Sequence, residues 1–213
     1  MFAINSSLNM KLKYPINLHK GLTFFVVSGL MYYFNNFSIT AQLYLALHGS
    51  YGFLWLLKDC WYPDKQWEKS VSVPYAVLVF SSLCLYWAAP VILISQGVEP
   101  PNYILFLAVL LNVWGVFLHF GSDAQKFYTL KYAPGLITEG FFASNRNVNY
   151  LGEFLTYFSF SLLAFHWIPF AVLGAFGAFV FLPNMVRKDK SLARYPQFEA
   201  YRKSSGFALP RLF

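Results

Sequence analysis

PNYILFLAVLLNVWGVFLHF, residues 101–120, contains no Asp, Glu, Lys or Arg. A helix needs about 20 residues to cross the hydrocarbon core of a bilayer, and this run is long enough. The whole chain is 57% hydrophobic and only 12% charged, whereas soluble domains carry roughly 25% charged residues. Because so few charges cannot coat a globule in water, the sequence predicts an integral membrane protein.

Five further apolar runs lie on both sides of this one, so we expect an all-α, polytopic bundle of about six transmembrane helices. The expected spans are 21–38, 39–57, 71–95, 101–120, 149–166 and 168–183. No low-complexity linker or clear repeat divides the chain. We therefore expect a single membrane domain over residues 1–213.

The basic residues predict how this bundle is oriented. All 16 Lys and Arg residues are expected outside the spans, in the N-terminal segment, after the second and fourth spans, and in the C-terminal tail. The connections near Asn36, Glu99 and His166 hold none. Since basic residues collect on the cytoplasmic side of membranes, both termini are expected in the cytosol, in a bacterial inner membrane or the endoplasmic reticulum. The same asymmetry explains the net charge of +7, so we expect membrane lipids and no nucleic acid as partners.

The stretch SNRNVNYLGEF, residues 144–154, carries a polar stripe into the fifth span. Arg146, Asn149, Tyr150, Glu153 and Tyr157 share one face at helical spacing. A carboxylate inside a span costs a few kcal/mol (about 3) unless it is paired. Two interpretations stay open: a capping and interhelical hydrogen-bond network, or the wall of a ligand pocket that opens to the cytosol.

A second candidate group follows the fourth span, where Asp123 and Lys126 are i, i+3 neighbours. Such a pair is often an ordinary interfacial contact. Together with Arg146 and the basic tail, Lys126 also offers cations to a phosphate-bearing ligand or to anionic lipid headgroups. On the fourth span itself, Asn112 and His119 share one face and are candidates to line the same cavity.

A third candidate pair, His48 and Tyr51, lies one turn apart within the second span. Such a pair can donate a proton to a substrate carbonyl, or it can simply hydrogen-bond to a neighbouring helix. Cys60 and Cys84 form no metal-binding pattern, and we expect no metal site.

Four segments, in this order, resemble the C-terminal half of steroid 5-alpha-reductase-like proteins, and the DUF1295 group most closely. They are SDAQK (122–126), GLITEGFF (135–142), NRNVNYLGE (145–153) and KDKSLARYPQFEAYRKSSGFALP (188–210). The resemblance covers about 112–213 and extends distantly to isoprenylcysteine carboxyl methyltransferases. It implies a cofactor-binding half at 112–213, with substrate-side helices at 21–111.

The resemblance implies an NADPH-dependent reductase of a carbon–carbon double bond in a lipophilic, steroid- or enone-like small molecule, with the cofactor on the cytosolic side. Asp123, Asn149 and Glu153 match family positions that hold the cofactor, and Arg146, Tyr150 and the basic tail match more loosely. The sequence departs from the steroid reductases because it has no Gln-Glu dipeptide. The alternatives are an S-adenosylmethionine-dependent methyltransferase, although Arg146-Asn147-Val148 replaces the usual Arg-His-Pro of that branch, and a non-catalytic lipid-binding or scaffold protein.

Overall fold

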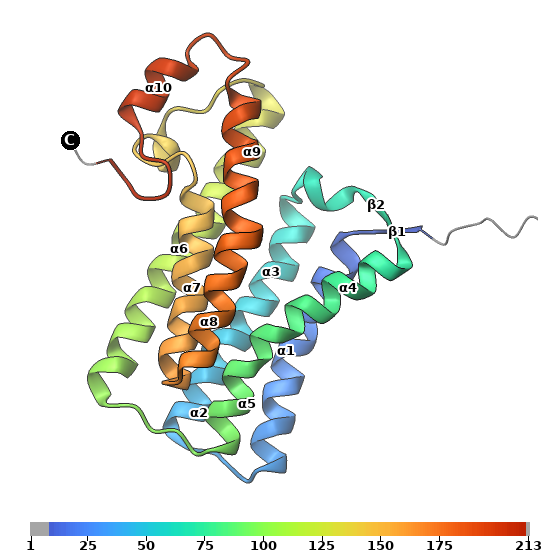
Figure 1. Cartoon of the computed structure of the whole chain (residues 1–213), viewed down its shortest axis with the longest axis vertical. Helices are drawn as coiled ribbons and strands as arrows, with labels where there is room; N and C mark the ends of the chain where they lie inside the picture. Colours follow the sequence, from blue (N-terminus) through green and yellow to red (C-terminus); the bar gives the residue numbers. More distant parts are fainter. Residues whose placement is uncertain (1–8, 212–213) are drawn as a thin grey trace, which may run out of the picture.

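The computed structural model describes residues 9–211 and is helical apart from one short two-stranded sheet (Figure 1). The first five helices are α1 (Lys13–Tyr33), α2 (Ile39–Tyr44), α3 (Ser50–Trp61), α4 (Val73–Cys84) and α5 (Ala88–Ser95). The remaining five are α6 (Asn102–Tyr132), α7 (Val148–Ala164), α8 (Trp167–Phe176), α9 (Leu182–Leu192) and α10 (Phe198–Ser204). Short π or 3-10 turns join α2 to α3, α4 to α5 and α8 to α9, so each of these pairs forms one longer rod.

Three rods in the described part of the chain are long and apolar enough to cross a membrane. They are Val73–Ser95, Asn102–Tyr132 and Trp167–Leu192. The predicted all-α membrane protein is therefore confirmed. Helices also occupy the other expected spans, but α7 has only 17 residues, and α1 carries Lys13 and Lys20.

Several predicted boundaries were wrong because helices continue past the apolar runs. Helix α1 begins at Lys13, α6 continues to Tyr132, and the α8–α9 rod ends at Leu192. Lys20 and Lys58, expected in segments outside the spans, lie inside α1 and α3 with 3% and 2% of their surface exposed. Each has buried partners, described below, and these partners are what allows a lysine to remain in the helix bundle.

Glycines on two helices permit a very close contact between α6 and α7. A Cβ atom on Gly115 would lie 2.5 Å from Thr156 Oγ1, and one on Gly152 would lie 2.4 Å from the His119 backbone nitrogen. Only glycine permits this approach. The contact brings the polar residues of α6 beside those of α7, and buried residues of α1–α3, α5, α6, α7 and α8 share one core.

The two ends of the bundle differ in composition. The α1–α2, α5–α6 and α7–α8 connections lie together at one end, the lower end in Figure 1, and contain no Lys or Arg. At the other end lie α10, the loop 133–147 and the sheet of β1 (Asn9–Lys11) and β2 (Ser70–Ser72). There Glu68 forms ion pairs with Lys11 and Lys13, at 2.7 and 2.5 Å, which tie the loop 62–69 to the N-terminal segment.

Candidate functional site

A cluster of buried polar side chains lies where α1, α3, α6 and α7 meet. We call it the polar cluster; its members are at most 6% exposed and are Lys20, Tyr51, Lys58, His119, Asp123 and Tyr157. Burying charged groups away from water is costly unless they are paired. A concentration of such groups at one helix junction is therefore the first place to look for chemistry.

One arm of the polar cluster is a chain of contacts from α3 to α6. Lys58 Nζ lies 3.0 Å from Asp123 Oδ2, and His119 Nε2 lies 3.6 Å from the same oxygen. On the other side of the imidazole, His119 Nδ1 lies 3.3 Å from the Tyr51 hydroxyl oxygen. A hydroxyl, an imidazole and a carboxylate thus follow one another, an order that can orient or relay a proton.

The other arm is built around Lys20 of α1. Its ammonium group donates a hydrogen bond to the Tyr157 hydroxyl. It also lies over the rings of Tyr51, Trp55 and Tyr157, at 4.6, 4.7 and 4.8 Å from their centroids. Within residues 9–211 no carboxylate forms an ion pair with it, so the aromatic rings supply most of its close contacts.

Two acceptor oxygens, one in the polar cluster and one near the start of α7, lack donors among the described residues. Asn149 Oδ1 and Asp123 Oδ1 are buried and have no hydrogen-bond partner among the described residues. Glu153, one turn beyond Asn149 on α7, is half-buried. An unsatisfied buried acceptor costs about 1–3 kcal/mol. Asn149 and Asp123, both predicted to hold the cofactor, therefore each have a buried acceptor oxygen that a ligand could satisfy.

Arg146 is engaged elsewhere in this structure. Its guanidinium group forms a two-oxygen contact with Asp189 of α9, at 3.1–3.3 Å, and donates to the carbonyl oxygens of Arg202 and Ser205. The hydroxyl of Tyr201 donates to the Phe142 carbonyl at 2.7 Å, and burial raises the pKa of Tyr201 to about 12. These contacts hold the C-terminal tail, residues 193–211, against the loop 133–147, as the network interpretation of the stripe predicts for Arg146.

The predicted Asp123–Lys126 pair is replaced by two longer-range pairs. Asp123 contacts Lys58, as above, while Lys126 forms an ion pair with Asp64 of the α3–α4 connection. Lys188 of α9 donates to the Arg146 carbonyl at 2.6 Å. Long side chains from different helices can reach one carboxylate, so i, i+3 spacing did not determine the partners.

His48 and Tyr51 do not act as one pair. The His48 Nδ1 atom lies 2.9 Å from the Tyr44 hydroxyl, and its ring stacks on Phe160 at 4.1 Å. Tyr51 instead faces His119. The π-helical turn Leu45–Gly49 lies between α2 and α3, and residues there do not follow α-helical spacing.

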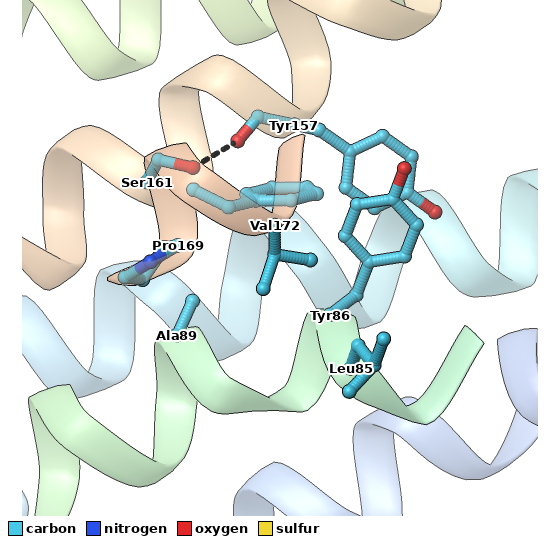
Figure 2. A pocket seen from close by; sticks show the side chains of 8 residues that line it. Leu85, Tyr86, Ala89, Tyr157, Ser161, Pro169 and Val172 are labelled. Atoms are coloured by element: carbon cyan, nitrogen blue, oxygen red, sulfur yellow. Dashed lines mark hydrogen bonds between the residues drawn. The ribbon is translucent and has the colours of Figure 1, made fainter. Parts of the chain in front are cut away.

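Tyr150 and Tyr157 complete the stripe on α7. The Tyr150 ring packs against Phe181 at 5.7 Å. Tyr157 joins the polar cluster and borders a small cavity of about 10 Å³ between α5, α7 and α8 (Figure 2). The sequence pattern did not point to Lys20, Lys58 or Tyr86 as site residues; the two lysines were expected only as basic residues outside the spans. The sequence signal for Lys20 was its place directly before the apolar run of the first expected span, where a lysine needs a partner if the helix is buried.

The fold and these contacts define a class: a helical membrane protein with a charged and hydrogen-bonding cluster enclosed between its helices. A family model described as "Protein of unknown function (DUF1295)" matches residues 59–204. The chain belongs to this family, as the sequence predicts, and the match begins well before residue 112. No curated protein and no solved structure matches the chain.

Proposed function

We propose that this protein is a membrane-embedded, NADPH-dependent reductase of a carbon–carbon double bond conjugated to a carbonyl, in a lipophilic substrate of the steroid or enone type. The observation that carries the proposal is the pair of unsatisfied acceptors, Asn149 Oδ1 and Asp123 Oδ1, beside a buried cluster of proton-bearing groups. The resemblance to steroid 5-alpha-reductase-like proteins supports the same reaction class.

The residues at the site fit the polar groups of NADPH. Hydroxyl and carboxamide hydrogens need acceptors, and Asn149, Asp123 and Glu153 offer them. Phosphates need cations, and Lys126 and Lys188 lie at the end of the bundle where α6 and α9 leave the apolar region. Lys126 would exchange its contact with Asp64 for a phosphate. Arg146 would not touch the cofactor directly but would hold the C-terminal tail and Asp189 in place.

The chemistry divides between cofactor and protein. Bound NADPH supplies the hydride. The protein has to exclude water, orient the substrate and provide a proton for the oxygen that gains electrons. Tyr51 contacts His119, which lies beside Asp123, so this first arm of the cluster would orient the substrate and help to supply protons to the site, while the predicted partner His48 contacts Tyr44.

The same proposal includes six membrane crossings with both termini and the cofactor site in the cytosol. Its support is the distribution of charge: the three connections that share one end carry no Lys or Arg, and the opposite end carries the basic loops. Substrate would enter from the bilayer.

One observation favours NADPH over S-adenosylmethionine, the alternative cofactor. The aromatic rings of Tyr51, Trp55 and Tyr157 already surround a cation, the Lys20 ammonium group. A sulfonium beside them would meet like charge, whereas a hydride donor would not. The presence of buried charged groups with defined partners also counts against a non-catalytic scaffold, because such groups cost stability.

The test is cofactor binding by the purified protein in detergent. We expect NADPH to raise the unfolding temperature, and Glu153→Gln and Asn149→Leu each to weaken NADPH binding by about tenfold. Glu139→Gln, an exposed carboxylate in the loop 133–147, is the matched control and should bind as the wild type does. Stabilisation by S-adenosylmethionine and not by NADPH would replace the proposal with the methyltransferase alternative. Equal NADPH binding by all variants would remove Glu153 and Asn149 from the site.

A further inference from the structure

Two buried tyrosine hydroxyls have hydrogen atoms that no group in residues 9–211 accepts. The Tyr157 oxygen accepts a hydrogen bond from Lys20, but within the described residues no group accepts the hydrogen of Tyr157. The Tyr86 hydroxyl, on the turn between α4 and α5, is buried and has no partner there at all. Buried hydroxyls normally find partners, so two adjacent exceptions need a reason.

The two tyrosines are neighbours and are held rigidly. Their rings stack with centroids 3.8 Å apart and an interplanar angle of 21°. Tyr86 stacks on its other side against Phe176, at 4.3 Å. Figure 2 shows both hydroxyl groups at the same end of the stacked pair, turned away from Ser161 and Pro169. The fold thus presents two hydroxyl donors side by side without an acceptor.

The charge behind these hydroxyls is positive. Lys20 contacts the Tyr157 oxygen directly, and no carboxylate in the described chain forms an ion pair with Lys20. At longer range Glu153 of α7 and Lys58 of α3 act on Lys20, and the Glu153 carboxylate also acts on the hydroxyls of Tyr86 and Tyr157, so Lys20 is the charge in direct contact with the pair. A hydroxyl that accepts a hydrogen bond from a cation becomes a stronger donor. Two hydroxyl donors, one of them strengthened by Lys20, and a cation in a buried site favour a negatively charged oxygen.

We propose that Tyr86 and Tyr157, backed by Lys20, form a binding site for the carbonyl oxygen of a lipophilic substrate and stabilise it as negative charge develops there. The site supplies the acid function for which the sequence has no Gln-Glu dipeptide. The proposal rests on the proposed reductase function for its reaction, but its binding chemistry can be tested without cofactor.

A small cavity lies beside the rings on the side of Ser161 and Pro169, so a lipophilic ligand that entered there would have to pass the rings to reach the hydroxyls. The cavity is lined mainly by apolar side chains, including Leu85, Ala89, Phe160 and Val172 (Figure 2). At about 10 Å³ it has room for about one water molecule. A substrate must therefore move side chains to enter, and Leu85, which is 55% exposed at the rim, is free to do so.

The electron and proton balance of the reaction is complete with these groups. A hydride from the bound cofactor would form a bond to the β-carbon of the enone. The double-bond electrons shift to form a new bond between the α-carbon and the carbonyl carbon, and the carbonyl π electrons move onto oxygen. Tyr157 donates its proton to that oxygen, Lys20 returns a proton to Tyr157, and Lys20 regains its own from water. The resulting enol then tautomerises to the saturated ketone.

The experiment uses 4-nitrophenol, an uncharged phenol whose anion is yellow, as a mimic of the negatively charged oxygen. Purified protein in detergent, without cofactor, is titrated with it near pH 6.5, and absorbance reports the ionised bound form. We expect the wild type to bind the anion. Tyr86→Phe and Tyr157→Phe, which keep the ring stack, should each weaken anion binding about tenfold. Lys20→Met should abolish the yellow bound form.

The matched control is Tyr44→Phe, a buried tyrosine whose hydroxyl contacts His48 instead. It should bind the anion as the wild type does. If both Tyr86→Phe and Tyr157→Phe bind the anion with unchanged affinity, the oxygen site is refuted, even if Lys20→Met fails to fold. A loss as large in Tyr44→Phe would refute it as well. If the protein binds the anion but not NADPH, the oxygen site stands and the proposed reductase is rejected. If it binds NADPH but the tyrosine variants bind the anion as the wild type does, the oxygen site is rejected and the reductase stands.

Discussion

Replacement of Lys58 by methionine tests whether the Lys58–Asp123 pair holds α3 against α6. The two charges lie 3.0 Å apart, and their side chains are 3% and 7% exposed. At an effective dielectric constant of about 20, their attraction is roughly 5–6 kcal/mol, before the cost of desolvation is subtracted. Removal of one partner from a buried pair costs about 3–5 kcal/mol, because the other charge stays buried without compensation.

We expect Lys58→Met to destabilise the protein by about 3 kcal/mol, the lower end of that range, since His119 remains 3.6 Å from Asp123 Oδ2. For a chain of this size, such a loss lowers the unfolding temperature by about 10 °C. The assay is thermal unfolding in detergent without ligands. The double variant Lys58→Met/Asp123→Asn should recover most of the loss, because it leaves no unpaired charge.

The exposed pair Arg202–Glu199 is the control, with side chains that are 60% and 69% exposed. Glu199→Gln should change the stability by less than about 0.5 kcal/mol. The reasoning fails if Lys58→Met is as mild as Glu199→Gln. It also fails if the double variant is less stable than the wild type by the full sum of the losses of the two single variants, because the pair would then not couple α3 to α6.

Three other predictions concern separate parts of the fold. Gly152→Ala places a Cβ 2.4 Å from the backbone nitrogen of His119 and should lower the free energy of unfolding by about 1–3 kcal/mol. The control Gly174→Ala, whose Cβ would have nothing within 4 Å, should be neutral or slightly stabilising. Equal effects of the two variants would contradict the α6–α7 contact. Arg146→Met should release the C-terminal tail and speed trypsin cleavage there severalfold, and an unchanged cleavage rate would show that other contacts hold the tail. Hydrogen bonds from Lys11 and Lys13 lower the pKa of Glu68 below its ordinary value of 4.5. The stability that Glu68 contributes to the sheet is therefore complete above pH 4.5 and is lost as the pH falls through the lowered pKa. Tryptophan emission should report this acid transition in the wild type and not in Glu68→Gln; the same transition in both would assign it to another group.

Local sequence patterns predicted the helices well because each pattern reflects a local cause. Uncharged runs such as residues 101–120 fix where helices can lie in a bilayer, and the Asn149-to-Glu153 spacing fixes one face of α7. The helix ends were less predictable. Once α6 leaves the apolar run, its polar residues find partners on other segments, and so the helix continues to Tyr132.

Side-chain partners in the site could not be read from spacing, because they depend on how the helices cross. Lys126 lies near Asp123 along α6 but pairs with Asp64, far away in sequence. His48 and Tyr51 are one turn apart, yet each faces a different helix neighbour. The glycine contact between α6 and α7 determines which side chains meet, and one sequence does not reveal that two glycines on different helices are opposite each other.

Lysines in this membrane protein have two different roles: some mark its orientation, and others belong to the buried polar cluster. Lys20 and Lys58 were counted with the residues that set orientation, but both are removed from water inside helices. A lysine at the membrane surface costs nothing to keep and reports topology. A buried lysine reduces stability unless it has partners. Among the described residues, Lys58 contacts a carboxylate, whereas Lys20 contacts a hydroxyl and three aromatic rings. The charge asymmetry remains without them, because the loops and the tail carry the rest. Lys20 is therefore better explained by the chemistry at Tyr157 than by orientation, and its replacement by methionine should change ligand binding more than it changes topology.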